Sequence, residues 1–524
     1  MIAESPFATH LERPLGRGHT PADAFTGAAG GAACGDLIRI SLALDLASPH
    51  GRIADAGFDA SGCGAVLAAG SATVALVRDT PLLDAARVGA EEIAAELGGL
   101  LPAKRHAAEL AADALHRALG AAARACGPLA GPIDAATEGE RTHGGGRAPA
   151  ARTLVAMSGG VDSAVAALLT ARTGEQVVGV TLELWADAEN DAERSCCSAQ
   201  AVRTARDLAH AQGFPHFSID LREEFRAGVV DGWLEGYAQG VTPNPCIRCN
   251  GSVRLDAMLE LAARLGAERL VTGHYARVVD GPPPLLRVAR DKLKDQSYAL
   301  AGLDPASLAR LKFPLGDITK DEVREIAARG GLSVAGKPDS QDLCFLAGTS
   351  LPRFLARHGG SGAAHAPAAS DDSVGNGDVG NGGAEGEGSI VDLDGRTLGI
   401  HRGAHTFTVG QRHGLGLPGG SEPLFVLSTD VVANTVTVGP RAELMTGTVA
   451  VRDVTLRAPG AGVDGVRVRS HGPLLPCRLT SDPGPGRHDG VEVCLNKPTA
   501  RAAPGQIACL YEGDVILGYG IISA

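Results

Sequence analysis

An apolar run, Thr153-Leu154-Val155-Ala156-Met157, leads directly into the segment Ser158-Gly159-Gly160-Val161-Asp162-Ser163. The run predicts a buried strand, and apolar residues recur at helical spacing from Val161 onward. Glycines between a strand and a helix let the backbone approach a ligand, and the free N–H groups at the helix start attract an anion. The segment therefore predicts a phosphate-binding turn, with Ser158 and Ser163 as hydroxyl donors and Asp162 as a candidate magnesium ligand.

The turn lacks the lysine of the P-loop pattern G-x-x-x-x-G-K-[ST], which argues against a γ-phosphate-transferring site of that class. A structural tight turn capped by serine is the alternative. Two further apolar runs, at residues 177–180 and 270–272, alternate with helical segments. This alternation predicts a doubly wound parallel sheet whose site lies at the carboxyl ends of its strands.

Composition divides the 524-residue chain into blocks. Residues 1–126 place strand-like segments before helical ones, which predicts an α+β domain. Residues 153–355 carry the α/β pattern of a catalytic domain. Short β-branched runs separated by Gly and Pro predict a central β-rich domain at 390–446 and a C-terminal β-barrel at 447–524.

Two segments rich in small and polar residues separate these blocks. Neither buries enough apolar surface to offset chain entropy, so 127–152 is a predicted linker and 356–389 a predicted disordered insertion. No run of 18 apolar residues occurs and residues 1–19 lack an apolar centre, so neither a membrane span nor a secretory signal is expected. Eleven cysteines without an export signal indicate a reducing compartment, and we expect a cytoplasmic protein with no membrane partner.

The formal net charge of −12 does not exclude a nucleic-acid partner, because phosphate binding depends on local basic surface. Basic side chains cluster within residues 287–294, at 412–413 and within 467–471. Such clusters are usually solvated faces, so they do not establish nucleic-acid binding by themselves.

Two cysteines lie in a C-x-x-C framed by prolines, Thr242-Pro243-Asn244-Pro245-Cys246-Ile247-Arg248-Cys249-Asn250, and a third lies in Asp342-Leu343-Cys344-Phe345. Asn250 is a candidate cap for the helix that follows. A zinc site needs four ligands, and the adjacent Cys196 and Cys197 are a poor fourth. A buried inert thiol is the default for any lone cysteine, but it explains a proline-framed C-x-x-C less well.

The turn and both cysteine segments occur in order with three more segments. These are Thr272-Gly273-His274-Tyr275, Lys294-Asp295-Gln296-Ser297-Tyr298 and Gly410-Gln411-Arg412-His413-Gly414-Leu415-Gly416. From about residue 153 to the C-terminus the chain resembles the bacterial tRNA-specific 2-thiouridylase (MnmA) family. The turn also resembles the SGGxDS pyrophosphate loop of the ATP pyrophosphatase superfamily, whose members adenylate a substrate oxygen.

The resemblance implies an enzyme that uses ATP to 2-thiolate the wobble uridine of tRNA. ATP adenylates the 2-carbonyl oxygen, and a persulfide on Cys344, loaded by a donor such as a cysteine desulfurase or sulfur relay protein, attacks the activated carbon. Cys249 resolves the reaction through a disulfide with Cys344 or by releasing sulfide. Alternatively, Cys246, Cys249 and Cys344 hold three irons of a 4Fe–4S cluster. The non-enzymatic alternative is an iron–sulfur or sulfur trafficking protein that binds tRNA.

The resemblance also implies binding residues. The implied ATP contacts are Ala156, Met157, Ser158, Gly159, Gly160, Val161, Asp162, Ser163, Leu182 and Gly273. The implied tRNA contacts are Asn244, Pro245, Cys246, Lys294, Asp295, Gln296, Arg469 and Ser470. The chain departs from the family pattern at Gly251, where a basic residue is common, and at Ser470, where an aromatic residue is common.

The N-terminal block contains Ala33-Cys34-Gly35-Asp36, Gly62-Cys63-Gly64 and Leu101-Pro102-Ala103-Lys104-Arg105-His106. Over roughly residues 1–125 it resembles the IscU/NifU-type iron–sulfur scaffold. The resemblance implies a third cysteine after His106, where this chain has Ala107. The implied ligands that remain are Cys34, Asp36, Cys63 and His106. They suit zinc or a labile iron–sulfur cluster, and a docking domain without metal is the alternative.

Overall fold

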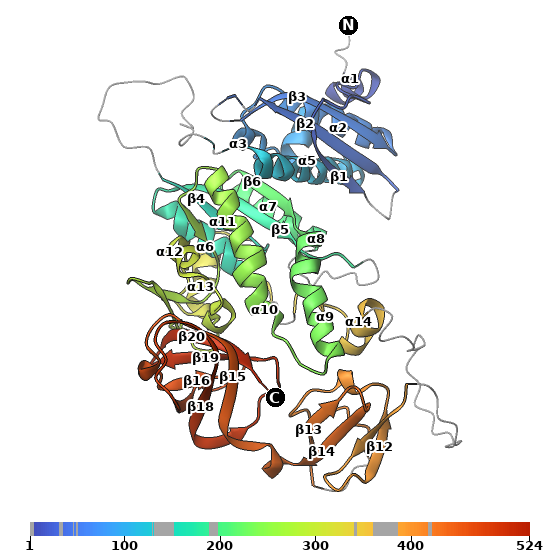
Figure 1. Ribbon diagram of the computed structural model, residues 1–524. Coiled ribbons are helices and arrows are strands. Elements are labelled where there is room, and N and C mark those ends of the chain that lie inside the picture. Colours follow the sequence, from blue (N-terminus) through green and yellow to red (C-terminus); the bar gives the residue numbers. More distant parts are fainter. Residues whose placement is uncertain are drawn as a thin grey trace. The chain divides into compact units, whose positions relative to one another are not determined.

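The computed structural model describes two compact units (Figure 1). Unit 1 consists of Met1–Glu223, Arg254–Tyr275 and Ala309–Phe345, and unit 2 consists of Glu224–Val253, Ala276–Leu308 and Leu346–Ala524. The described residues are 5–30, 35–45, 47–48, 51–127, 129, 151–187, 198–339, 343–359, 386–417 and 422–523. Cys34, Cys196, Cys197 and most of the predicted linker and insertion lie outside them.

The N-terminal domain of unit 1 is a three-stranded antiparallel sheet covered by helices. Its strands are β1 (Phe25–Gly30), β2 (Leu37–Asp45) and β3 (Arg52–Ser61), in that spatial order. Its helices are α1 (Pro6–Glu12), α2 (Gly64–Val77), α3 (Leu82–Ala85), α4 (Ala90–Glu96) and α5 (Arg105–Ala125). The strands before the long helices confirm the predicted α+β order, and the alanine- and leucine-rich face of α5 is buried.

The second domain of unit 1 is a five-stranded parallel sheet in the order β10-β7-β4-β5-β6. Its strands are β4 (Arg152–Ala156), β5 (Gln176–Glu183), β6 (His216–Asp220), β7 (Arg269–Val271) and β10 (Leu311–Lys312). Its helices are α6 (Val161–Arg172), α7 (Ala199–Ala211), α11 (Leu255–Arg264) and α13 (Lys320–Arg329). The chain adds β5 and β6 on one side of β4, then β7 and β10 on the other. This order confirms the doubly wound fold and places the topological switch point between β4 and β7.

Helix α5 of the N-terminal domain lies beside β6, the edge strand of the parallel sheet (Figure 1). The His116 side chain on α5 is fully buried, with Nδ1 2.8 Å from the carbonyl oxygen of His216 on β6. Burial lowers the pKa of both histidines well below the usual value, which keeps the rings neutral. Arg206 on α7 is 1% exposed and donates to Asp113 on α5 at 2.8 Å. The N-terminal domain therefore covers the edge of the sheet with two neutral histidines and a buried Arg206–Asp113 ion pair.

Unit 2 contains two β structures. The first is a four-stranded sheet in the order β12-β11-β14-β13, made of β11 (Gly388–Val391), β12 (Thr397–His401), β13 (Leu424–Asp430) and β14 (Thr435–Pro440). The second contains β15 (Met445–Leu456), β16 (Gly465–Arg467), β17 (Leu475–Leu479), β18 (Gly486–Ala500), β19 (Ile507–Glu512) and β20 (Val515–Ile522). Pairing of β15 with both β18 and β20 closes these strands into the predicted barrel.

Two short strands from the middle of the chain extend the barrel sheet. They are β8 (Arg277–Val279) and β9 (Leu285–Arg287), and β9 pairs with β20. The helices of unit 2 include α9 (Asp231–Ala238), α10 (Pro245–Arg248), α12 (Pro305–Ala309) and α14 (Leu351–His358). Among the described residues, no helix combines the length and apolar character that crossing a membrane requires.

We expect Asp113→Ala to lower the free energy of unfolding by about 3 kcal/mol, because it leaves the buried Arg206 guanidinium without this carboxylate. Urea unfolding followed by circular dichroism measures the loss. Glu109→Ala is the matched control, since Glu109 lies on the same helix but pairs with the less buried Arg203. That variant should lose under about 1 kcal/mol. Equal losses in the two variants would contradict the importance of the buried pair.

Candidate functional site

The predicted phosphate-binding turn joins β4 to α6 at the switch point. Gly159 has a φ of +65°, and a Cβ there would lie 2.5 Å from the carbonyl oxygen of Ala201, so only glycine fits. The Ser163 hydroxyl accepts from the Ser158 N–H at 3.1 Å and donates to the Gly160 carbonyl at 3.1 Å. These bonds fold the turn closely around the start of α6.

Gly273, which follows β7, lies against the same turn. A Cβ at this position would lie 2.8 Å from the Ser163 nitrogen, so the close approach requires glycine. His274 beside it is partly exposed, but desolvation lowers its pKa to about 3 and keeps the ring neutral, with Nδ1 2.8 Å from the Thr272 hydroxyl. The turn and Gly273, both predicted ATP contacts, thus come together in unit 1.

Two lysines from distant segments reach this turn. Lys320, which is 7% exposed at the start of α13, donates to both carboxylate oxygens of Asp162, at 2.7 and 2.8 Å. It also pairs with Asp339 at 2.9 Å. Lys337 donates to the carbonyl oxygen of Gly159 at 2.9 Å. Lys337 opens the sequence segment that leads to Cys344 and Lys320 lies in no such segment, and the sequence assigned neither a role at the turn.

Lys320 occupies both carboxylate oxygens of Asp162, the residue predicted to bind magnesium. One carboxylate oxygen accepts from Lys320 and from the Tyr275 hydroxyl at 2.8 Å, and the other accepts from Lys320. Asp162 is therefore an ion-pair partner here, and magnesium ligation would require Lys320 to move. Magnesium binding by this residue stays a prediction.

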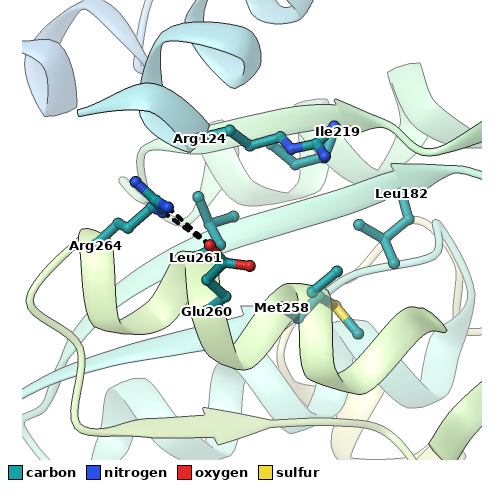
Figure 2. A pocket seen from close by; sticks show the side chains of 8 residues that line it. Arg124, Leu182, Ile219, Met258, Glu260, Leu261 and Arg264 are labelled. Carbon is teal, nitrogen blue, oxygen red and sulfur yellow. Dashed lines mark hydrogen bonds and ion pairs between the residues drawn. The ribbon is translucent and has the colours of Figure 1, made fainter. Parts of the chain in front are cut away.

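The remaining predicted ATP contacts have other surroundings. Ala156 ends β4, while Met157 and Val161 are each 3% exposed, so their side chains pack into the core. Leu182, near the end of β5, lines a cavity of about 250 Å³ (Figure 2). The full lining is Arg124, Leu182, Ile219, Ala257, Met258, Glu260, Leu261 and Arg264. No residue of the turn lines this cavity, so an adenosine contact by Leu182 stays a prediction.

Three of the four predicted metal ligands meet in the N-terminal domain. The donor atoms of Asp36, Cys63 and His106 all lie within 4.8 Å of one another. The Cys63 thiol is 3.2 Å and His106 Nε2 is 3.1 Å from the same buried Asp36 oxygen. His106 Nδ1 lies 3.1 Å from the Ala103 carbonyl oxygen, a contact that orients the ring with Nε2 toward Asp36.

This donor set fits a metal. An imidazole oriented by a carbonyl, a thiol and a carboxylate are usual ligands of zinc, and the thiol also suits iron. Ala107, at the position of the third family cysteine, is fully buried and offers no donor. Cys34 lies outside the described residues, so its part in the cluster stays a prediction.

The C-x-x-C segment lies in unit 2. Asn244 accepts from the Cys246 N–H at 3.0 Å and caps α10, while Cys249 is buried at the start of the π-helical segment η3 (Cys249–Arg254). Asn250 does not cap the following helix as expected. It lies inside the helical segment, and its side chain donates to the Ala299 carbonyl at 3.2 Å.

The predicted tRNA segments of unit 2 converge on the barrel. Asp295 is 4% exposed, and its carboxylate accepts from the Ala289 N–H, the Ser297 N–H and hydroxyl, and Arg467 at 2.8 Å. A carboxylate so enclosed shapes the loop, and a tRNA contact by Asp295 stays a prediction. The Arg467 pair ties the loop of Lys294 and Gln296 to the strand that precedes Arg469 and Ser470.

A tyrosine links the C-x-x-C segment to the same surface. The Tyr298 hydroxyl donates to the Ile507 carbonyl at 2.9 Å, and burial, opposed by a hydrogen bond with the Asn244 side chain, raises its pKa. Asn244, Pro245 and Cys246 are therefore held beside the Lys294 loop by interactions within unit 2.

The predicted partner of Cys249 belongs to the other unit. Cys344 is partly exposed in unit 1, next to Phe345, whose ring lies edge-on to Trp185 with centroids 6.4 Å apart. The pairing of Cys249 with Cys344 therefore stays a prediction. Three other cysteines are poorer candidates for a reactive thiolate, because burial raises their pKa. They are Cys126, Cys509 and Cys477, the last with a pKa of about 12.

Comparison with known families matches four consecutive regions. Residues 6–124 match a NifU-like N terminal domain and residues 151–348 a tRNA methyl transferase HUP domain. Residues 380–440 match a tRNA methyl transferase PRC-barrel domain, and residues 460–522 match an aminomethyltransferase beta-barrel domain. These matches confirm the predicted fold classes in order along the chain.

The bifunctional protein NifU/MnmA of Rubrobacter xylanophilus is 40% identical over 98% of this chain and 97% of its own length. The chain belongs to the bifunctional NifU/MnmA family. Its NifU/MnmA character is supported further by the tRNA-specific 2-thiouridylases MnmA of Thermobifida fusca and Chloroflexus aurantiacus. They are 42% and 39% identical over 71% of this chain, covering 95% and 98% of their own lengths. Both resemblances drawn from the sequence are confirmed.

For the NifU-like cluster, we expect Cys63→Ser to lower the metal content of the purified full-length chain by at least about half, because the soft donor is lost. Elemental analysis for zinc and iron after anaerobic purification measures it. Cys126→Ser is the control, since Cys126 is buried away from the cluster and should keep its metal. Equal metal in wild type and Cys63→Ser would favour a docking domain without metal.

Proposed function

We propose that this protein is a cytoplasmic tRNA uridine 2-sulfurtransferase that uses ATP and a cysteine-bound sulfur. The observation that carries the proposal is the serine–glycine turn at the switch point, in a chain similar over nearly its whole length to a NifU/MnmA protein. A turn of this kind binds phosphates through backbone N–H groups. The lysines that reach it supply the positive charge that the motif itself lacks.

In the first proposed step, the uridine 2-carbonyl oxygen attacks the α-phosphorus of ATP and pyrophosphate leaves. The turn and the start of α6 hold the departing phosphates. Lys337 is exposed beside Gly159, where its ammonium can offset their charge, and Lys320 pairs with Asp162 and Asp339 and so reduces their repulsion of the phosphates. Bound magnesium would share the phosphate charge, with Asp162 as the candidate ligand.

In the second step, the terminal sulfur of a Cys344 persulfide attacks the activated carbon and AMP leaves. The Cys249 thiolate then attacks the Cys344 sulfur, which frees 2-thiouridine and leaves a disulfide that an external thiol must reduce. A desulfurase or relay protein reloads Cys344. The iron–sulfur alternative, with Cys246, Cys249 and Cys344 as ligands, stays open.

The proposed tRNA surface lies on unit 2. Lys294 and Arg469 supply phosphate contacts, while Gln296 and Ser470 supply polar contacts. The Asn244–Cys246 segment lies beside this surface and would contact the target base once it is turned out of its stack. The NifU-like domain is proposed to carry zinc or a labile iron–sulfur cluster on its Asp36, Cys63 and His106 cluster.

We expect Cys249→Ser to lower thiolation by more than about 100-fold, because an alcohol neither forms the disulfide nor accepts sulfur. Nucleoside mass spectrometry measures 2-thiouridine, and filter binding should show tRNA affinity within about twofold of wild type. Cys477→Ser, in the barrel core, is the control and should stay active. Persistent thiolation in Cys249→Ser would remove the role assigned to this residue.

We expect Lys320→Met to lower kcat/KM for ATP by about tenfold or more, because Asp162 and Asp339 would face the phosphates without their shared cation. Pyrophosphate release in the presence of tRNA provides the measurement. Lys312→Met, which breaks the Lys312–Glu175 ion pair in the same unit, should stay within about twofold. Similar losses in both variants would show general destabilisation instead of a role at the turn.

A further inference from the structure

One ion pair joins α5 of the N-terminal domain to the carboxyl end of β5 in the parallel sheet. Arg117 on α5 donates through Nε and Nη2 to the two carboxylate oxygens of Glu183, at 2.9 and 2.7 Å. Its third nitrogen donates to the Ala28 carbonyl on β1 at 2.7 Å. The guanidinium is thereby hydrogen-bonded to its own domain and, at the same time, to Glu183, the last residue of β5.

Glu183 depends on this partner. It is 6% exposed, and a carboxylate removed from water is stable as an anion only when it is paired. Burial opposes the charge on Arg117, but the hydrogen bond and charge of Glu183 raise its pKa above the usual value. A planar fork facing both oxygens also fixes the direction of the carboxylate.

The end of β5 lies at the edge of the sheet where this fold class binds nucleotides. β5 pairs directly with β4, whose continuation is the serine–glycine turn, and ligands bind such sheets at the carboxyl ends of the strands. Glu183 directly follows Leu182, the residue predicted to contact adenosine. The Glu183 carbonyl also accepts from the Leu221 N–H at 2.9 Å, so a shift of Glu183 would move the ends of two adjacent strands.

We infer that Arg117 is a positioning residue for ATP, through which the NifU-like domain completes the nucleotide site of the thiolation domain. The inference rests on the proposed use of ATP. It assigns the N-terminal domain a task that does not depend on its proposed metal cluster. That task is to fix the end of β5 by pairing Arg117 with the buried Glu183 carboxylate.

The test is the ATP affinity of the full-length chain, measured by isothermal titration calorimetry without tRNA. We expect Arg117→Met to weaken ATP binding by about tenfold or more, and to raise KM for ATP while kcat stays within about threefold. Arg117→Lys keeps the positive charge but cannot bond both Glu183 oxygens in the same plane, so it should give an intermediate loss of ATP affinity. This variant provides the test if Arg117→Met does not fold.

Two further variants separate positioning from general loosening of the interface. Arg203→Met removes the ion pairs of α7 with Glu109 and Asp113 and leaves Glu183 paired, so ATP affinity should stay within about twofold. The double variant Arg117→Met with Glu183→Gln removes the unpaired charge and should recover most of the affinity.

The inference is overturned if Arg117→Met or Arg117→Lys binds ATP as wild type does, if Arg203→Met loses as much affinity, or if the double variant recovers none. A wild-type chain that binds ATP but thiolates no tRNA would remove the proposed function while these comparisons still decide the role of Arg117. A wild-type chain that binds no ATP would overturn both.

Discussion

The end of β7 meets the first turn of α6 with no room for a side chain at Gly273. This contact exists because the chain reverses its direction of winding between β4 and β7, so the segments after both strands enter one crevice. It places the Tyr275 hydroxyl against Asp162, and Asp162 in turn orients Lys320. The phosphate turn is therefore positioned by backbone packing first and by charge second.

Features with a local signal could be predicted from the sequence. The buried strand before the serine–glycine turn, the α+β order of the first block and the β-branched runs of the barrel each follow from residues adjacent in the chain. Asp36, Cys63 and His106 were also predictable, since each lies in a recognisable segment, and the structure brings them within 4.8 Å. Strands β6 and β10 were missed, because β6 alternates polar residues with apolar ones and β10 has two residues.

Features that depend on distant partners were not predictable. Lys320 and Lys337 are ordinary charged residues until the fold brings them to Asp162 and Gly159. Asp295 lies in a motif that suggests RNA contact, and nothing local in the sequence shows that its side chain is enclosed by a pair with Arg467, far along the chain. The expected cap at Asn250 failed for a local reason, since the helical backbone already extends through it.

Helix α5 carries His106 in its first turn and Arg117 three turns later, about 16 Å along one rigid axis. The Asp36, Cys63 and His106 cluster therefore lies at a fixed distance along α5 from the parallel sheet against which α5 packs. A swinging-arm delivery of cargo, in which a tethered carrier visits its consumer, would first have to break desolvated pairs such as Arg206–Asp113. With these pairs intact, any cargo held at Asp36, Cys63 and His106 would have to reach a consumer by itself or on a separate protein.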